Sequence, residues 1–308
     1  MKNIYFYLSV FCLSFVLFSS CDNFEGKQEI PAYLKINKIE LDPNSDSNPG
    51  HLTSDIRSVL VTAIDPKKNK EEVIGTFELP CEIPILLEGE IEIRIAPVVI
   101  QDLNTATQTV YPFLDRIIDT VTLKQGVTTT LDPVIYTKYN TAPAWEECFE
   151  ELSTGFFSND GSITISTINS PVKSGTKSGF IGFESSDTID LYTLETFYIP
   201  NTQQTFGLYL EFDYWTTDIL YVGMTGFNKA GNQIAVVNQL QIPTVKDGSS
   251  PKDTDKWRKV YVSLYSLWSS YFDMNENFKI GFWACKNKNS SHPGIYIDNI
   301  KLFYAQAQ

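Results

Sequence analysis

The chain has 308 residues, with 37 acidic side chains against 24 basic ones and a formal net charge of −13 at pH 7. This charge argues against nucleic acid or anionic lipid headgroups as partners, because both require patches of lysine and arginine. Aromatic residues make up 13% of the sequence, and helix-type periodicity is hard to find, so the composition favours an all-β protein. The length predicts two domains.

The first twenty-one residues follow the order of a bacterial lipoprotein signal. A basic start, Met1-Lys2-Asn3, precedes an apolar run from Ile4 to Phe18, and two serines lead to Cys21. The run is shorter than the roughly 20 residues that a membrane-spanning helix needs. We predict that residues 1–20 are a signal peptide and that Cys21 carries the lipid. An ordinary secretory signal, with Cys21 incidental, is the alternative.

The residues after the cysteine are Asp22-Asn23-Phe24-Glu25. They resemble the acidic export signal of surface lipoproteins of the Bacteroidota. The resemblance implies a lipid-anchored protein of the outer membrane that faces the cell exterior. Residues 21–31 are polar, so we expect a lipidated tether that holds the folded body away from the membrane.

Strand signals then recur at regular spacing as far as residue 140. Glu90 to Ile95 alternates most cleanly, with isoleucines expected in the core and Glu90, Glu92 and Arg94 in water. Strands at this spacing, separated by Pro and Gly turns, predict an Ig-like β-sandwich over residues 32–140. The other strands expected here are Ala32 to Leu41, Ser58 to Ile64, Val73 to Leu79, Asp119 to Leu123 and Thr128 to Tyr136, with Gly126 at a turn.

This half resembles a β-sandwich module found in lipoproteins of the Bacteroidota. The resemblance implies a fold and a surface setting, without an activity. Pro80 and Pro84 are expected to end strands or lie on edge strands, because proline donates no hydrogen bond to a sheet. The residues that carry the resemblance are Ile74 to Pro80, Ile83 to Leu86, Ile91 to Pro97 and Tyr111-Pro112-Phe113.

Thr137 to Pro143 is polar and is the expected domain boundary. The second domain, residues 144–308, contains Phe149-Glu150 near its start, the segment Ser174 to Gly179, and Tyr296 to Leu302 near its end. This order resembles a jelly-roll of the galactose-binding or carbohydrate-binding-module type. The predicted fold is therefore all-β, with two β-sandwich domains, the second a jelly-roll.

A structural calcium ion often lies between the first and last strands of such jelly-rolls. Glu150 and Asp298 match the acidic positions of that motif, and the segment from Lys173 to Lys177 is expected to lend carbonyl oxygens. The resemblance thus implies a structural Ca²⁺. The alternative is that Asp298 caps a turn and that Glu150 is solvated.

Four predicted strands place apolar residues on one face, and aromatic and acidic residues on the other, by their two-residue period. Aromatic rings beside carboxylates suit sugar recognition, and they equally suit a protein interface. A third alternative is that the rings are buried against another sheet, a loop or the first domain. The candidate ligand-binding residues are Tyr209, Glu211, Asp213, Trp215, Tyr261 and Trp283.

Catalytic motifs are absent from the sequence, including Gly-x-Ser-x-Gly, His-Glu-x-x-His and a phosphate loop. His51 and His292 are expected to be solvated loop residues. Cys148 and Cys285 are either a disulfide or two free thiols. We therefore expect no enzyme. The favoured function is a surface lipoprotein that binds glycan through its jelly-roll, and the alternative is a structural or accessory subunit of an outer-membrane protein complex.

Overall fold

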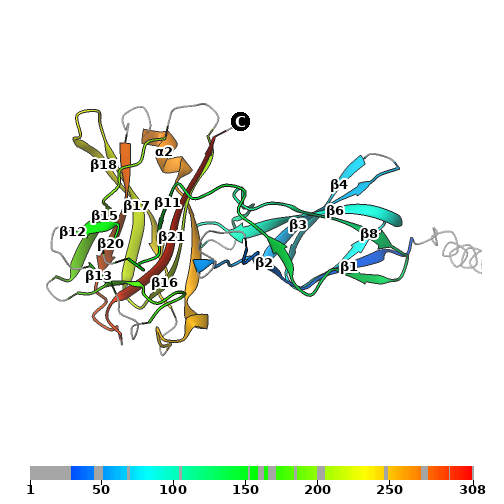
Figure 1. The fold of residues 1–308 in the computed structure, drawn as a ribbon, viewed down its shortest axis with the longest axis horizontal. Helices are drawn as coiled ribbons and strands as arrows, with labels where there is room; N and C mark the ends of the chain where they lie inside the picture. The colour runs from blue at the N-terminus through cyan, green and yellow to red at the C-terminus, as the bar shows by residue number, and fades with distance from the viewer. Residues whose placement is uncertain are drawn as a thin grey trace, which may run out of the picture.

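The computed structural model describes residues 29–44, 51–67, 70–103, 106–151, 153–158, 163–165, 171–183, 186–199, 205–245, 249–271, 277–290 and 292–306. The chain forms two β-sandwich domains arranged end to end along one axis (Figure 1). The predicted fold class is confirmed. The predicted lipidation site, Cys21, lies outside the described residues. No helix in the described ranges has the length and apolar character needed to cross a membrane.

The N-terminal domain has one large sheet, in the order β4-β3-β6-β7 with β8 also paired to β6. Two small sheets, β5-β1-β9 and β10-β2, complete the sandwich. The strands are β1 (Ala32–Ile36), β2 (Ile39–Leu41), β3 (Ser58–Asp65), β4 (Lys70–Glu78), β5 (Cys81–Ile85), β6 (Gly89–Ile100), β7 (Gln108–Val110), β8 (Ile117–Leu123), β9 (Thr128–Thr130) and β10 (Ile135–Thr137).

Alternation along β6 explains this core. Ile91, Ile93 and Ile95 are buried, as predicted, because successive side chains point to opposite faces of a sheet. Pro84 lies within β5, which is the edge strand of its small sheet, so its missing N–H group leaves no central ladder bond unmade. The strand expected from Thr128 to Tyr136 is interrupted and forms β9 and β10.

The C-terminal domain consists of two facing sheets. One has the order β13-β14-β21-β16-β19, with β11 paired to β21, and we call it the junction sheet. The other has the order β12-β15-β20-β17-β18, and we call it the distal sheet. The elements are β11 (Trp145–Glu147), β12 (Phe156–Ser158), β13 (Ile163–Ile165), β14 (Gly179–Ile181), β15 (Thr188–Thr193), β16 (Thr205–Thr216), β17 (Ile219–Phe227), β18 (Gln233–Ile242), η2 (Thr254–Lys256), β19 (Arg258–Ser263), α2 (Tyr265–Tyr271), β20 (Asn277–Cys285) and β21 (Ile295–Gln306).

The core between these sheets contains the apolar sets that the two-residue period predicts. These side chains pack into one cluster with almost no exposed surface. The inward assignments for β16, β17, β19 and β20 are therefore confirmed. They comprise Leu210, Phe212, Tyr214, Leu220, Val222, Met224, Val260, Val262, Leu264, Phe278, Ile280, Phe282 and Ala284. Cys148 and Cys285 are free thiols, so the disulfide alternative is wrong.

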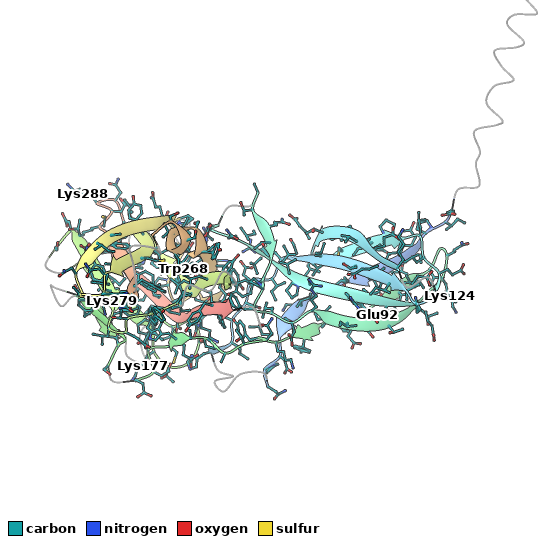
Figure 2. All side chains as sticks on the ribbon, turned by 90° about the horizontal axis from the view of Figure 1, so that it is seen from above. Glu92, Lys124, Lys177, Trp268, Lys279 and Lys288 are labelled. Carbon is teal, nitrogen blue, oxygen red and sulfur yellow. The ribbon has the colours of Figure 1, made fainter. Side chains whose placement is uncertain are left out.

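The two domains are joined through the junction sheet. The chain just after β6 continues this sheet, because Gln101 forms a parallel bridge to Tyr261 on β19. Asp102 strengthens the join, since its N–H donates to Tyr261 O at 2.9 Å and its Oδ1 accepts from Ser263 N at 2.9 Å. Strand β1 lies toward the opposite end of the molecule from the distal sheet (Figure 1). Figure 2 shows the same separation between Lys124 and Lys279.

Candidate functional site

The structure assembles the predicted ligand face as the alternation requires. Tyr209, Glu211 and Asp213 occupy every second position of β16 and so share one face, and Tyr261 on β19 lies opposite Glu211. All four project from the junction sheet, away from the core of the C-terminal domain. Their exposed fractions are nonetheless 8%, 0%, 1% and 3%. The prediction of an exposed sugar-binding surface at these residues is therefore wrong, because the N-terminal domain covers them.

Aromatic rings of the N-terminal domain form much of that cover. The Tyr111 ring meets the Tyr209 ring edge-on at 5.4 Å between centroids, and the Tyr261 ring at 5.0 Å. Phe113 stacks on Phe303 of β21 at 5.1 Å. These rings belong to one buried cluster shared by both domains. The face is thus the interface between the domains, which is the third of the alternatives that the sequence left open.

Polar groups cross the same interface. The Tyr139 hydroxyl donates to Glu211 Oε1, and the Thr53 hydroxyl donates to Asp213 Oδ2. Lys259 Nζ lies 3.4 Å from Glu211 Oε1 and donates to Thr53 Oγ1 at 3.1 Å. Because a buried charge is tolerated only when it is paired and hydrogen-bonded, these carboxylates require the domains to stay docked.

Tyrosines around Glu211 remain protonated. Burial raises the pKa of Tyr139 and Tyr261 well above the usual tyrosine range, and the charge of Glu211 raises both further. The pKa of Tyr111 is raised in the same way and by the same causes. Neutral phenols beside a carboxylate avoid a second negative charge in the interface.

A second cluster of polar side chains at the domain junction includes His51. Its Nδ1 lies 3.3 Å from Asn299 Oδ1 and 3.4 Å from Ser174 Oγ. His51 is half-buried, so the prediction that it is a solvated loop residue is wrong. Burial raises the pKa of the nearby Asp298 carboxyl to about 8, and the charge of Asp213 contributes. With this pKa, the Asp298 carboxyl is mostly protonated at pH 7.

Trp215 lies away from the domain interface and is also fully buried. It packs with Val245, Trp257 and Tyr296, and its ring lies 5.9 Å from that of Tyr296. The His292 ring approaches it edge-on at 5.9 Å. Trp215 therefore fills a small cluster of its own, and its prediction as an exposed ligand contact is wrong.

The predicted calcium ligands meet a different chemistry from the one expected. Residues 176 and 177 donate backbone N–H groups to Glu150 Oε1 at 2.7 and 3.0 Å. Residues 173 and 174 donate theirs to Asp298 Oδ2, both at 3.1 Å. The loop that was expected to lend carbonyl oxygens thus presents hydrogen-bond donors, which use the lone pairs that a calcium ion needs. Within the described ranges, no three His, Cys, Asp or Glu side chains gather as a metal-ligand group. In this arrangement the oxygens of Glu150 and Asp298 do not fit a calcium ion. Calcium binding by the protein stays a prediction.

Trp283 differs from the other five candidate residues, because it lies on the distal sheet and is only half-buried. On the same outer face, Tyr192 of β15 meets its ring edge-on at 5.9 Å. Phe157 of β12 lies 5.7 Å from Tyr192, and Tyr221 of β17 stands directly opposite Trp283. We call these four residues the aromatic row. It crosses four neighbouring strands on a face that points away from the N-terminal domain (Figure 1).

Glycines determine how the indole lies. Gly281 precedes Trp283 by two residues on the same face, and Gly223 of β17 stands opposite Gly281. A Cβ atom added to Gly281 would lie 2.7 Å from Trp283 Cζ2, too close for real atoms. The indole therefore lies flat over Gly281, where no side chain props it up. A ring held flat against a sheet presents its opposite face to a ligand.

Polar groups flank the aromatic row. Asp190 stands opposite Trp283 on β15, and Gln241 stands opposite Tyr221 on β18; both are exposed. Lys279, on the same face of β20, donates from Nζ to the Thr193 carbonyl at 2.7 Å (the residue is labelled in Figure 2). Such a surface can stack on the C–H face of a sugar ring while carboxylate and amide groups bind its hydroxyls.

Sequence reasoning placed Tyr221 and Trp283 outward but missed Phe157 and Tyr192. Both lie on short strands, β12 and β15, that were not predicted. The signal for β15 was present, because Ile189 and Leu191 alternate with polar and aromatic residues and are buried in the core.

No family model matches this chain, and no curated protein matches it. Among solved structures, the CBM22-1 xylan-binding domain from Paenibacillus barcinonensis Xyn10C is 10% identical, covers 55% of this chain and 99% of that chain, and has a TM-score of 0.34. TmCBM61, solved in complex with β-1,4-galactotriose, is 10% identical, covers 49% of this chain and 87% of that chain, and has a TM-score of 0.30.

The enzymatically active domain of tailspike protein 4 from bacteriophage CBA120 is 13% identical, with a TM-score of 0.33. That match covers 52% of this chain and 20% of the tailspike chain. The structural neighbours thus include β-sandwich domains of the carbohydrate-binding-module type. What each neighbour binds is a property of that neighbour.

Proposed function

We propose that this chain is a non-catalytic, lipid-anchored surface protein that binds glycan through the aromatic row. One observation carries the proposal: the Trp283 indole lies flat over Gly281, beside Tyr192 and Tyr221, on an accessible sheet face. Truncating a Trp or Tyr to alanine is among the substitutions that cost a binding surface the most binding free energy. The carboxylate of Asp190 and the amide of Gln241 supply hydrogen bonds to the glycan at the edge of the aromatic row.

The shape of the molecule supports a surface role. The N-terminal strand β1 and the distal sheet lie toward opposite ends of the long axis (Figure 1). If Cys21 carries the lipid, the aromatic row points away from the membrane, and the N-terminal domain acts as a spacer. The proposed location is the outer membrane, facing the cell exterior.

Binding to a panel of soluble polysaccharides tests the proposal, with the folded protein and its Trp283→Ala variant compared in affinity gels. We expect at least one polysaccharide to retard the wild-type protein. Loss of Trp283 should weaken that binding about 30-fold, because truncating a central aromatic anchor costs about 2 kcal/mol. The melting temperature should change little, because the indole is only half-buried.

A matched tyrosine pair provides the control. Tyr192→Ala removes a ring from the aromatic row, whereas Tyr136→Ala removes an exposed ring, 52% accessible, from the N-terminal domain. Tyr192→Ala should weaken binding and Tyr136→Ala should not. Equal effects of the two, or no retention on any polysaccharide, would remove the support for glycan binding at this face.

Docking on an outer-membrane protein is the second candidate. Ile234 and Val236 are 41% and 44% exposed on β18, the edge strand of the distal sheet next to the aromatic row. Exposed apolar side chains beside aromatic rings also suit a protein interface. A partner that co-purifies in mild detergent at one-to-one stoichiometry, and is lost in Val236→Lys, would favour this alternative. A Val236→Lys variant that still binds polysaccharide would favour the first.

A further inference from the structure

A cavity of about 310 Å³ lies at the edge of the domain junction. It is bounded by the chain before β3, by the end of β6 and by β19. This site is separate from the aromatic row, which lies on the other sheet of the C-terminal domain. Its volume is at the lower end of the range for small-molecule sites, which is roughly 300–1,000 Å³.

The walls of the cavity differ in chemistry. Ile100, Leu103 and Pro243 supply an apolar wall. The charged lining consists of three cations and one carboxylate, which is unusual in a chain with a net charge of −13. These charged residues are Arg57, Arg258, Lys259 and Asp55.

Contacts within the protein use only part of this positive charge. Lys259 is turned toward Glu211, at 3.4 Å. Asp55 Oδ1 accepts from Arg57 Nε at 2.7 Å, which leaves the terminal nitrogens of that guanidinium to other partners. Arg258 forms no ion pair with any described residue; it lies directly opposite Tyr214 of β16. The cavity thus retains two sets of donors: the terminal nitrogens of Arg57, whose charge Asp55 balances, and the Arg258 guanidinium, which no described carboxylate pairs.

We propose that this cavity binds a small organic carboxylate. The planar guanidinium groups of Arg57 and Arg258 match a carboxylate, because they donate paired hydrogen bonds in a fixed geometry. The body of the ligand packs against Ile100, Leu103 and Pro243. A sugar acid and an aromatic acid share this chemistry, and the test below separates them.

Isothermal titration with the full folded chain tests the proposal. Benzoate and D-glucuronate are the probes, and benzamide and D-glucose are their uncharged counterparts. We expect at least one acid to bind at least tenfold more tightly than its neutral counterpart, and the tighter acid identifies the body of the ligand. The double variant Arg57→Gln/Arg258→Gln should lose that preference. Both side chains are exposed at the surface, so the fold should persist.

A second variant leaves the charges in place. Ile100→Trp should fill the cavity and weaken binding of the acid by about tenfold, with both arginines intact. Trp283→Ala, on the distal sheet, should leave the affinity for the acid unchanged. The proposal is overturned if neither acid is preferred over its neutral counterpart, or if the double variant binds as the wild type does. It is also overturned if Trp283→Ala abolishes binding while the cavity variants retain it, because the acid would then bind at the aromatic row.

Discussion

The two outer faces of the C-terminal sandwich carry related side chains in different surroundings. On the junction sheet, Tyr209 and Glu211 of β16 share one face with Tyr261 of β19, and all three are buried beneath the N-terminal domain. On the distal sheet, Tyr192 and Trp283 remain half-buried on a face that the N-terminal domain does not reach. One pattern of alternating rings and carboxylates thus serves a domain interface on one sheet and an accessible surface on the other.

The two faces differ in whether their charged side chains are buried. The junction sheet holds carboxylates in the middle of its strands and satisfies them with Tyr139 and Thr53 from the N-terminal domain. The distal sheet instead has Gly281 and Gly223 at its centre, which let an aromatic ring lie flat. Buried carboxylates require a fixed partner, whereas a flat ring over glycine needs none.

The largest expected effect is at the buried ion pair of the junction. Lys259→Met leaves the Glu211 charge buried without its cation, so the free energy of unfolding should fall by about 3–5 kcal/mol. Thermal denaturation followed by circular dichroism measures the change. The double variant Lys259→Met/Glu211→Met should recover much of the loss, because it leaves no uncompensated charge.

An exposed pair is the matched control. Lys38 pairs with Glu40 in the N-terminal domain, with side-chain exposures of 62% and 40%. Lys38→Met should cost about 0.5 kcal/mol or less, because water screens the pair. If Lys259→Met were as mild as Lys38→Met, the junction would not depend on its buried charges.

A smaller effect is expected at the glycine beneath the indole. Gly281→Ala places a Cβ within 2.7 Å of Trp283 Cζ2, so the ring must swing away from the sheet. Stability should fall by about 1 kcal/mol, the cost of a strained side-chain rotamer. Binding to the retained polysaccharide should weaken severalfold in affinity gels.

Gly182→Ala is the comparison for this variant. Gly182 also lies beneath a ring, with its added Cβ 3.0 Å from Phe180 Cε1, but it is outside the aromatic row. It should perturb stability without weakening polysaccharide binding. Loss of binding in both variants would show that the effect reports general destabilisation.

Calcium should have the smallest effect. The carboxyl oxygens of Glu150 and Asp298 already accept backbone N–H groups, so a chelator such as EGTA should leave the melting temperature unchanged. A rise in melting temperature on adding calcium would show that the loop rearranges around an ion. That result would restore the metal site that the jelly-roll resemblance implies.

The sequence predicted the core faces well, because alternation is local. The inward sets of β16, β19 and β20 follow directly from the two-residue period. What alternation cannot show is what covers the opposite face. Glu211 finds Tyr139, 72 residues away, and Asp213 finds Thr53, 160 residues away. These contacts depend on how two domains dock, which no single strand encodes.

The most direct test of glycan binding at the aromatic row uses the indole N–H resonances of the five tryptophans in a ¹⁵N-labelled sample. A fragment of the retained polysaccharide is titrated in, and each resonance is assigned by a Trp→Phe variant. We expect the Trp283 resonance to shift in proportion to occupancy while that of the buried Trp215 stays in place. A shift of Trp215 without a shift of Trp283 would contradict a binding surface on the distal sheet.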